Sequence, residues 1–322
     1  MPHLTVLIPT YNCGKYIEEC IISVINQKYT DYELIIIDDG SNDNTEEIVN
    51  NINDKRIAYL KNPVNMGIVA TLNRGLDIAK GKYIARMDAD DIMLGNRLGD
   101  QVDFLDQNAD YGMVGGWYQI IDENGALLKT LETSSDAEFL KLGLLFRNQF
   151  AHPSVTMRTD LARKLRYDQN YIYCEDHDLW IRFAEVSKVM NLPRLYLTYR
   201  WYGNNTCHIK QKELKLSVLK LLGRELDKID IAYNTTELML HAAVCFGVMP
   251  LLLRKPEKHS ELKGWLDKIL SSPVLKANYD ESVLQDLIKR VYLHCGISEE
   301  MVTFYKSIDQ IKKKILETNT QL

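Results

Sequence analysis

Asp88-Ala89-Asp90-Asp91 places three carboxylates within four residues, directly after the apolar run Tyr83-Ile84-Ala85-Arg86-Met87. Lys80-Gly81-Lys82 before that run is typical of a turn, so the run itself predicts a buried strand. Burying carboxylates without a partner costs several kcal/mol or more, so a positive group must lie beside them. Carboxylates at the carboxyl end of a strand form a hard oxygen site that suits Mg²⁺ or Mn²⁺ holding a diphosphate. The alternative is a solvated turn that caps a helix beginning near Asn96.

The elements that position this acidic motif alternate between strand and helix. Apolar segments typical of strands cover 4–8, 32–37, 56–60 and 83–87, and segments typical of helices cover 15–27, 45–53 and 68–79. This alternation predicts an α/β fold with a mostly parallel sheet and helices on both faces. Ligands of such sheets bind outside the carboxyl ends of the strands. Three polar clusters follow strand ends, and their convergence favours the metal site: Pro9-Thr10-Tyr11-Asn12, Asp38-Asp39-Gly40-Ser41 and Asp88-Ala89-Asp90-Asp91.

The first of these turns carries neither a Gly-x-Gly-x-x-Gly pattern nor a phosphate loop of the Walker type. It therefore predicts contact with a base or a sugar rather than with a pyrophosphate. Tyr11 has a ring that can stack on a nucleobase, and Asp39 can accept a hydrogen bond from a ring N–H or a ribose hydroxyl. The competing role for Asp39 is to cap the next helix, which fits Ser41 and Asp43 better.

The composition is that of an ordinary globular protein, with 46% hydrophobic and 26% charged residues in a chain of 322. A formal net charge of −5 and the lack of a long Lys/Arg block argue against nucleic acid as a partner. Six scattered cysteines without metal-type spacing predict reduced thiols in a cytosolic protein. The chain starts with a strand rather than a signal peptide. The apolar stretch 242–253 is too short to span a bilayer and predicts a buried helix, while contact with a membrane surface stays open.

The pattern changes twice along the chain. After residue 108 it loosens, with strands expected over 113–117, 120–121, 126–131 and 154–157 and a helix over 177–185. Beyond 209 it becomes helical and poor in strands, so we expect one domain over 1–209 and a helical C-terminal region over 210–322. Three roles stay open for that region: binding an acceptor lipid, self-association, or covering apolar surface.

These segments together resemble family 2 glycosyltransferases, which have the GT-A nucleotide-sugar-binding fold. The resemblance covers the chain before the helical region, and the order and spacing of its motifs are specific. It rests on Pro9-Thr10-Tyr11-Asn12, Asp38-Asp39-Gly40-Ser41 with Asp43 and Thr45, Asn65-x-Gly67, Asn73-x-Gly75, Ala79-x-Gly81, the acidic motif with Arg97-Leu98, and Cys174-Glu175-Asp176-His177-Asp178-Leu179-Trp180.

The resemblance implies a set of donor-binding residues and one metal ligand. Tyr11 would pack on the base, and Asp39 would bind the base or the ribose. Asp88 would lie beside the ribose and the metal, and Asp90 would ligate Mn²⁺ or Mg²⁺ across the diphosphate. The implied donor-binding set is Pro9, Tyr11, Asp39, Asp88, Ala89 and Arg97.

The resemblance also implies a general base in Glu175-Asp176, with Asp176 preferred and Glu175 on the acceptor side. Such a base takes the proton of the acceptor hydroxyl and typically contributes ~10²–10⁴-fold. The alternative is that both are helix N-terminal acids favoured by the macrodipole. His152 is expected on the acceptor side, with a satisfied buried histidine as the alternative. Trp180 is expected in the core.

Three further residues have weaker implied roles. Asp91 is expected to support the metal site or to cap the next helix rather than to bind the ion. Arg97 is expected as a structural or site-edge cation that pairs with the acidic motif, or in an ordinary surface ion pair. Tyr202 stands where relatives often carry a histidine, which leaves a third protein ligand for the metal in doubt. The Gly- and Asn-rich segment 203–206 is expected to form a lid over the diphosphate.

We therefore expect an inverting, metal-dependent glycosyltransferase that moves a sugar from a UDP-sugar to a hydroxyl of a glycan or lipid-linked acceptor. The resemblance implies synthesis of a cell-surface or secreted glycan from the cytosolic side, with peripheral membrane contact and self-association through the helical region left open. A rival of another class is a non-catalytic nucleotide-fold subunit that scaffolds a glycan-assembly complex. Its expected signature is a broken acidic motif, and here both sets of carboxylates are intact. A nucleotidyltransferase would need a Gly-rich loop with Arg and Lys after the first strand, which is absent.

Overall fold

The computed structural model describes residues 1–203, 210–247, 249 and 256–296. They form two compact units. The first unit consists of Met1–Leu144 and Asn148–Val218, and the second of Leu145–Arg147 and the chain from Leu219 onward. The predicted domain boundary near residue 209 stays a prediction.

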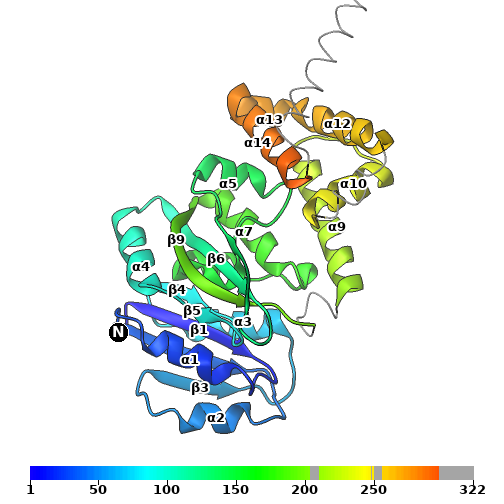
Figure 1. The fold of residues 1–322 in the computed structure, drawn as a ribbon. Helices are drawn as coiled ribbons and strands as arrows, with labels where there is room; N and C mark the ends of the chain where they lie inside the picture. The colour runs from blue at the N-terminus through cyan, green and yellow to red at the C-terminus, as the bar shows by residue number, and fades with distance from the viewer. Residues whose placement is uncertain (204–209, 248, 250–255, 297–322) are drawn as a thin grey trace, which may run out of the picture. The chain divides into compact units, whose positions relative to one another are not determined.

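The first unit begins with four parallel strands joined by helices, as the sequence predicted (Figure 1). The strands lie in the order β3-β2-β1-β4, and the register sets Thr10 beside Asp38 and Leu7 beside Arg86. The segments that follow β1, β2 and β4 therefore leave the sheet at the same edge. The elements are β1 (Leu4–Thr10), α1 (Ile17–Ile25), β2 (Tyr32–Asp38), α2 (Thr45–Asn51), β3 (Ile57–Lys61), α3 (Ile68–Ile78) and β4 (Tyr83–Arg86).

Helices cover both faces of this parallel half, because successive strand residues point in opposite directions. Leu4, Val6 and Ile8 of β1 belong to one buried cluster with residues of α1 and of α4 (Arg97–Gln107). Leu7 points to the other face, where α3 approaches closely. A Cβ at Gly75 would lie 2.4 Å from Leu7 Cδ1, so any larger residue there would push α3 away from the sheet.

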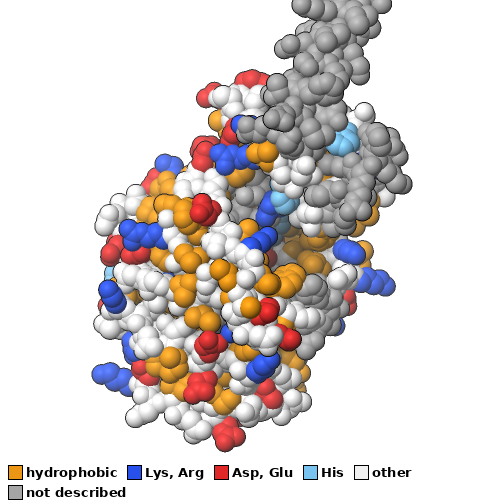
Figure 2. Space-filling model, viewed as in Figure 1, with side chains coloured by type: hydrophobic (Ala, Val, Ile, Leu, Met, Phe, Trp, Pro, Cys, Tyr) orange, Lys and Arg blue, Asp and Glu red, His pale blue; other side chains and the backbone are white. Residues whose placement is uncertain are grey.

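The sheet then continues with antiparallel pairings and becomes mixed. β4 pairs antiparallel with β8, β8 antiparallel with β6, β6 parallel with β9, and β9 antiparallel with β5, while β7 pairs with β6 off this path. The remaining elements of this part are β5 (Ile92–Met93), β6 (Tyr111–Ile121), β7 (Leu127–Leu131), α5 (Ala137–Gly143), η1 (His152–Ser154), β8 (Thr156–Arg158), α6 (Thr159–Leu165), η2 (Gln169–Tyr171), α7 (Glu175–Val186) and β9 (Lys188–Arg200). On the face drawn in Figure 2, acidic and basic side chains are interspersed over these elements.

Several sequence expectations in this half need correction. The segments 113–117 and 120–121 are one continuous strand, β6, and 154–157 is the end of η1 followed by β8. β9, with 13 residues, was not predicted. Its register on β6 jumps from Gly116↔Leu192 to Trp117↔Leu195, so Pro193 and Arg194 bulge out of the ladder. Proline has no N–H to donate, and a bulge is where a long strand accommodates it.

The described elements of the chain beyond residue 209 are all helices, which confirms the predicted helical region. They are α9 (Gln211–Lys228), α10 (Thr235–Cys245), α12 (Pro256–Leu270), α13 (Pro273–Asn278) and α14 (Glu281–His294). In the second unit, buried His241 holds three segments together, because its Nε2 lies 2.9 Å from the carbonyl oxygen of Leu145 and its Nδ1 accepts from Trp265 Nε1 at 3.1 Å.

Within the described residues, no helix is both long and apolar enough to cross a membrane. Of the apolar stretch 242–253, the first four residues end α10, while 248 and 250–253 lie outside the described residues. The expected lid over 203–206 lies outside them as well, apart from Gly203.

Candidate active site

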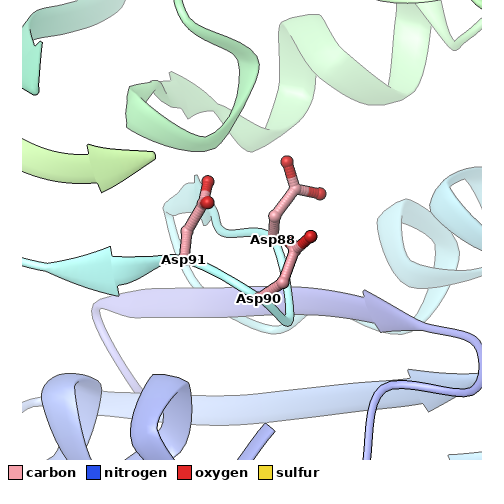
Figure 3. Close-up of side chains that lie close together, drawn as sticks. All are labelled: Asp88, Asp90 and Asp91. Atoms are coloured by element: carbon pink, nitrogen blue, oxygen red, sulfur yellow. The ribbon is translucent and has the colours of Figure 1, made fainter. Parts of the chain in front are cut away.

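The acidic motif lies where β4 leaves the sheet. Carboxylate oxygens of Asp88, Asp90 and Asp91 lie within 4.8 Å of one another. All three side chains point to the same side of the loop between β4 and β5 (Figure 3). The loop after β1 lies close to these carboxylates, as Cys13 indicates: burial and the charges of Asp90 and Asp88 raise the pKa of its thiol. The polar segments that follow β1 and β4 therefore share one site.

Each carboxylate of the motif has a different partner. Asp88 Oδ2 lies 2.5 Å from Arg86 Nη1, a close ion pair that is not aligned as a hydrogen bond. Asp90 Oδ2 accepts a hydrogen bond from the Tyr202 hydroxyl at 2.8 Å. Asp91 Oδ1 accepts from the main-chain N–H of Arg200 at 2.8 Å, while its buried Oδ2 has no hydrogen-bond donor among the described residues.

The motif carries more negative charge than the surrounding side chains balance. Burial, followed by the charge of Asp88, raises the pKa of Asp90 to about 6. Burial and the charges of Asp90 and Asp88 raise the pKa of Asp91 well above its usual value. A divalent cation with oxygen ligands fits this set of close carboxylates, including the donor-free oxygen of Asp91. Asp88 and Asp90 are partly exposed, whereas Asp91 is 1% exposed and bound to the backbone of β9.

Arg86 is a site residue that the sequence argument missed. Its side chain is 3% exposed and lies at the end of β4, two residues before Asp88. Burial raises the pKa of Asp90, Asp91, Glu175 and Asp176, and the charge of Arg86 opposes the rise in each case. The charge of Arg86 therefore acts on the acidic motif and on the second pair of carboxylates. A lone charged residue in an otherwise apolar strand was the available signal.

The second pair of carboxylates begins α7. Asp176 Oδ2 accepts from Asn148 Nδ2 at 2.7 Å, and its Oδ1 accepts from the main-chain N–H of His177 at 2.7 Å. Burial and the neighbouring charge of Asp176 raise the pKa of Glu175 to about 7, and burial raises the pKa of Asp176. Asp176 is fixed in orientation by two hydrogen bonds and its pKa is raised, and these are properties that a general base requires.

His152 lies beside Tyr167 and Trp180. His152 Nε2 lies 2.9 Å from the Tyr167 hydroxyl, and its ring meets Trp180 edge-on with centroids 5.6 Å apart. Burial and the charge of Arg86 lower the pKa of His152 well below its usual value, so the imidazole is neutral. Its expected place on the acceptor side stays a prediction. Trp180 is fully buried against Phe150 and Phe183, which confirms its expected place in the core.

The predicted donor-binding residues after β1 and β2 differ in accessibility. Tyr11 is 49% exposed, as a stacking platform requires, whereas Pro9 and Ala89 are buried and offer their backbone. Asp39 is 5% exposed and already accepts three hydrogen bonds, from Asn62 Nδ2 at 2.7 Å and from the main-chain N–H groups of residues 66 and 67 at 2.8 Å each. A carboxylate has roughly four acceptor positions, so about one is left for a ligand. Asp39 therefore orders the segment 62–67, and its predicted contact with base or ribose stays a prediction.

Arg97 has the structural role that was one of its expected roles, and its predicted place in the donor-binding set stays a prediction. Its guanidinium is fully buried and donates to the carbonyl oxygens of Arg86 at 2.7 Å, Pro153 at 2.6 Å and Val155 at 3.1 Å. Burial lowers its pKa to about 9. Arg97 thus ties the end of β4 to the segment before β8, and Arg86 takes the place beside the acids.

Replacing Arg97 with methionine should destabilise the fold strongly. The change removes the Arg97 donor of two buried carbonyl oxygens, those of Arg86 and Pro153, and each unsatisfied group costs about 1–3 kcal/mol. The carbonyl oxygen of Val155 keeps the main-chain N–H of Arg86 as a donor at 2.9 Å. We expect a loss of roughly 3–5 kcal/mol in the free energy of unfolding, measured by urea denaturation. Arg194→Met is the matched control, because the exposed Arg194 side chain forms a surface ion pair with Asp100, and its replacement should cost less than about 1 kcal/mol. Equal losses in the two variants would contradict the structural role of Arg97.

Comparisons with known proteins agree with this geometry. The family model described as "Glycosyl transferase family 2" matches residues 5–172. An uncharacterized glycosyltransferase of Haemophilus influenzae is 33% identical over an alignment that covers 99% of this chain and 98% of that protein. The UDP-Glc:alpha-D-GlcNAc-diphosphoundecaprenol beta-1,3-glucosyltransferase WfaP of Escherichia coli is 29% identical, with 69% of this chain and 88% of that protein covered. The crystal structure of S. aureus TarS 1-349 in complex with UDP-GlcNAc has the same fold, with a TM-score of 0.58, 18% identity, and 92% and 93% of the two chains covered.

Proposed function

Because the chain belongs to glycosyl transferase family 2, we propose that it is an inverting, divalent-metal-dependent enzyme that uses a UDP-sugar. One observation carries the proposal: Asp88, Asp90 and Asp91 meet within 4.8 Å at the edge where the parallel strands end. Arg86 links them electrostatically to Glu175 and Asp176. A donor and an acceptor held at these two sets of carboxylates would lie on either side of the reacting carbon.

The donor and acceptor classes rest on the relatives and on the half-exposed ring after β1. The full name of WfaP gives UDP-Glc as its donor and a lipid-linked diphosphate sugar as its acceptor, and TarS was crystallised with UDP-GlcNAc. Tyr11 would stack on the uracil ring. Asp39 and Asp88 would accept from the base or ribose, and Pro9 and Ala89 would contribute backbone groups. The acceptor would be a hydroxyl of a glycan or of a lipid-linked sugar in glycan synthesis.

The residues divide the reaction into two tasks. Asp90, supported by Asp88 and Asp91, would hold Mg²⁺ or Mn²⁺, and the ion would supply positive charge to the leaving diphosphate. Asp176 accepts the proton of the acceptor hydroxyl as its oxygen bonds to the anomeric carbon and the bond from that carbon to the diphosphate breaks. Asn148 and the N–H of His177 hold the Asp176 carboxylate in one orientation for this transfer. Attack from the side opposite the leaving group inverts the configuration.

A donor screen tests this function. Purified protein with Mn²⁺ should release UDP slowly from one UDP-sugar by hydrolysis, and added EDTA should abolish the release. Parallel thermal-shift measurements with UDP, GDP and dTDP should show stabilisation by UDP and Mn²⁺ together. A response to no nucleotide would contradict the catalytic proposal and favour the non-catalytic scaffold.

The pH profile of transfer should fall on the acidic side near neutrality. The pKa of Glu175 is raised to about 7 and that of Asp176 is raised, so the pair gains a proton as the pH falls, and a protonated base cannot accept another. We expect kcat at saturating metal and donor to fall about tenfold per pH unit below the apparent pKa of the pair. Glu175→Gln removes the negative neighbour and should shift this limb to lower pH. A flat profile between pH 5.5 and 8 would contradict the prediction.

A further inference from the structure

The end of β9 holds the acidic motif through three contacts that the proposed roles do not use. The main-chain N–H of Arg200 donates to Asp91 Oδ1 at 2.8 Å, and its Nε donates to the carbonyl oxygen of Asp90 at 3.1 Å. Two residues later, the hydroxyl of Tyr202 donates to Asp90 Oδ2 at 2.8 Å. The first two contacts fix the backbone and the neighbouring carboxylate. Of these three contacts, only the third reaches the side chain of Asp90, the proposed metal ligand.

Tyr202 is also held from a second direction, by Tyr16, the residue that precedes α1. The rings of Tyr202 and Tyr16 contact each other with centroids 5.5 Å apart. The Arg200 guanidinium lies 4.5 Å from the centroid of Tyr16 and pairs with Glu19 of α1 at 2.6 Å. Tyr202 is thus packed on one side and extends its hydroxyl to Asp90 on the other. An aromatic ring loses few rotamers when it is packed, so its hydroxyl is held in a defined place.

We propose that Tyr202 is a positioning residue for metal binding, which orients the Asp90 carboxylate so that Oδ2 is held by the phenol and Oδ1 faces the ion. The inference rests on the proposed function, because it requires that Asp90 ligates the metal. Without the hydroxyl, Asp90 would rotate about its side-chain torsions, and the ion would have to order it on binding. Partners that orient metal-binding carboxylates typically contribute 10–100-fold to metal affinity.

The test is the Mn²⁺ affinity of the full chain in the presence of saturating UDP, measured by electron paramagnetic resonance of free Mn²⁺. Tyr202→Phe removes only the hydroxyl. Tyr196→Phe is the matched control, because Tyr196 lies on β9 and its hydroxyl donates to an aspartate outside the motif, Asp100, at 2.9 Å. We expect Tyr202→Phe to weaken Mn²⁺ binding at least about tenfold and Tyr196→Phe to leave it within about twofold of the wild type.

Thermal unfolding of both variants separates loss of the fold from loss of positioning. If Tyr202→Phe unfolds, Tyr202→Trp, which keeps a ring and an N–H donor and adds no metal ligand, takes its place against Tyr202→Leu, and the Trp variant should bind Mn²⁺ at least about tenfold more tightly. Equal Mn²⁺ affinity in wild type and folded Tyr202→Phe, or equal losses in Tyr202→Phe and Tyr196→Phe, would overturn the inference and leave the proposed function standing. Failure of the wild type to bind Mn²⁺ with UDP would overturn both.

Discussion

Replacing Asp176 with asparagine should reduce sugar transfer on the order of 10²–10⁴-fold and leave UDP affinity within about twofold of the wild type. The amide keeps the size of the side chain and an oxygen that accepts from Asn148, but it cannot take a proton from the acceptor hydroxyl. The measurement is a comparison of single-turnover transfer rates with UDP titrations by calorimetry. The split between rate and binding distinguishes a base from a donor-binding group.

Asp160→Asn is the control for this variant. Asp160 is exposed in the first turn of α6, so the change removes a helix N-terminal carboxylate without touching the site. If Glu175 and Asp176 served only the helix macrodipole, both variants would lose about 0.3–1 kcal/mol of stability and neither would lose transfer. Loss of UDP binding in Asp176→Asn would move Asp176 out of the position of the base.

Replacing Asp90 with asparagine should abolish metal-dependent turnover, with a decrease of at least about 10³-fold in transfer and in donor hydrolysis. Charge stabilisation by a bound metal is worth several kcal/mol, and each 1.36 kcal/mol changes a rate about tenfold. The amide still accepts from the Tyr202 hydroxyl, so the loop should keep its shape. The readout is the dependence of UDP release on Mn²⁺ concentration.

Asp103→Asn is the matched control, since Asp103 is exposed on α4 outside the acidic motif. Asp103→Asn should keep the wild-type dependence on Mn²⁺. Full activity of Asp90→Asn at wild-type Mn²⁺ concentrations would show that the ion is held elsewhere. Activity without any metal in both variants would remove metal dependence from the proposal.

The parallel half of the fold was predictable because each strand is a short apolar run between turn signals. β9 was not, because Asn191, Pro193 and Arg194 interrupt its apolar pattern. The structure accommodates these residues in two ways: Asn191 is buried and donates from Nδ2 to the carbonyl oxygen of Gln149, and the other two bulge out of the ladder with β6. The buried hydrogen bond and the bulge both depend on contacts with segments that are distant in sequence, and the pattern of apolar residues within β9 gives no information about such contacts.

The site was predictable as far as its negative charges, which stand out in sequence after buried strands. The roles of the positive charges could not be told apart from the sequence, for a physical reason. Arg97 and Arg86 both lie near the acidic motif in sequence, and only the packing decides which guanidinium faces carbonyl oxygens and which faces Asp88. In an extended chain, side chains two residues apart point to the same side. Arg86 and Asp88 are two residues apart, so this rule favours their side chains lying together.

The most direct test of the central claim is anomalous diffraction at the manganese edge from crystals soaked with UDP and Mn²⁺. We expect one strong peak within ligand distance of an Asp90 carboxylate oxygen, about 2.0–2.6 Å, with the diphosphate on its other side. A peak bound by other residues, or a diphosphate seated without an ion beside Asp88 and Asp90, would contradict the claim.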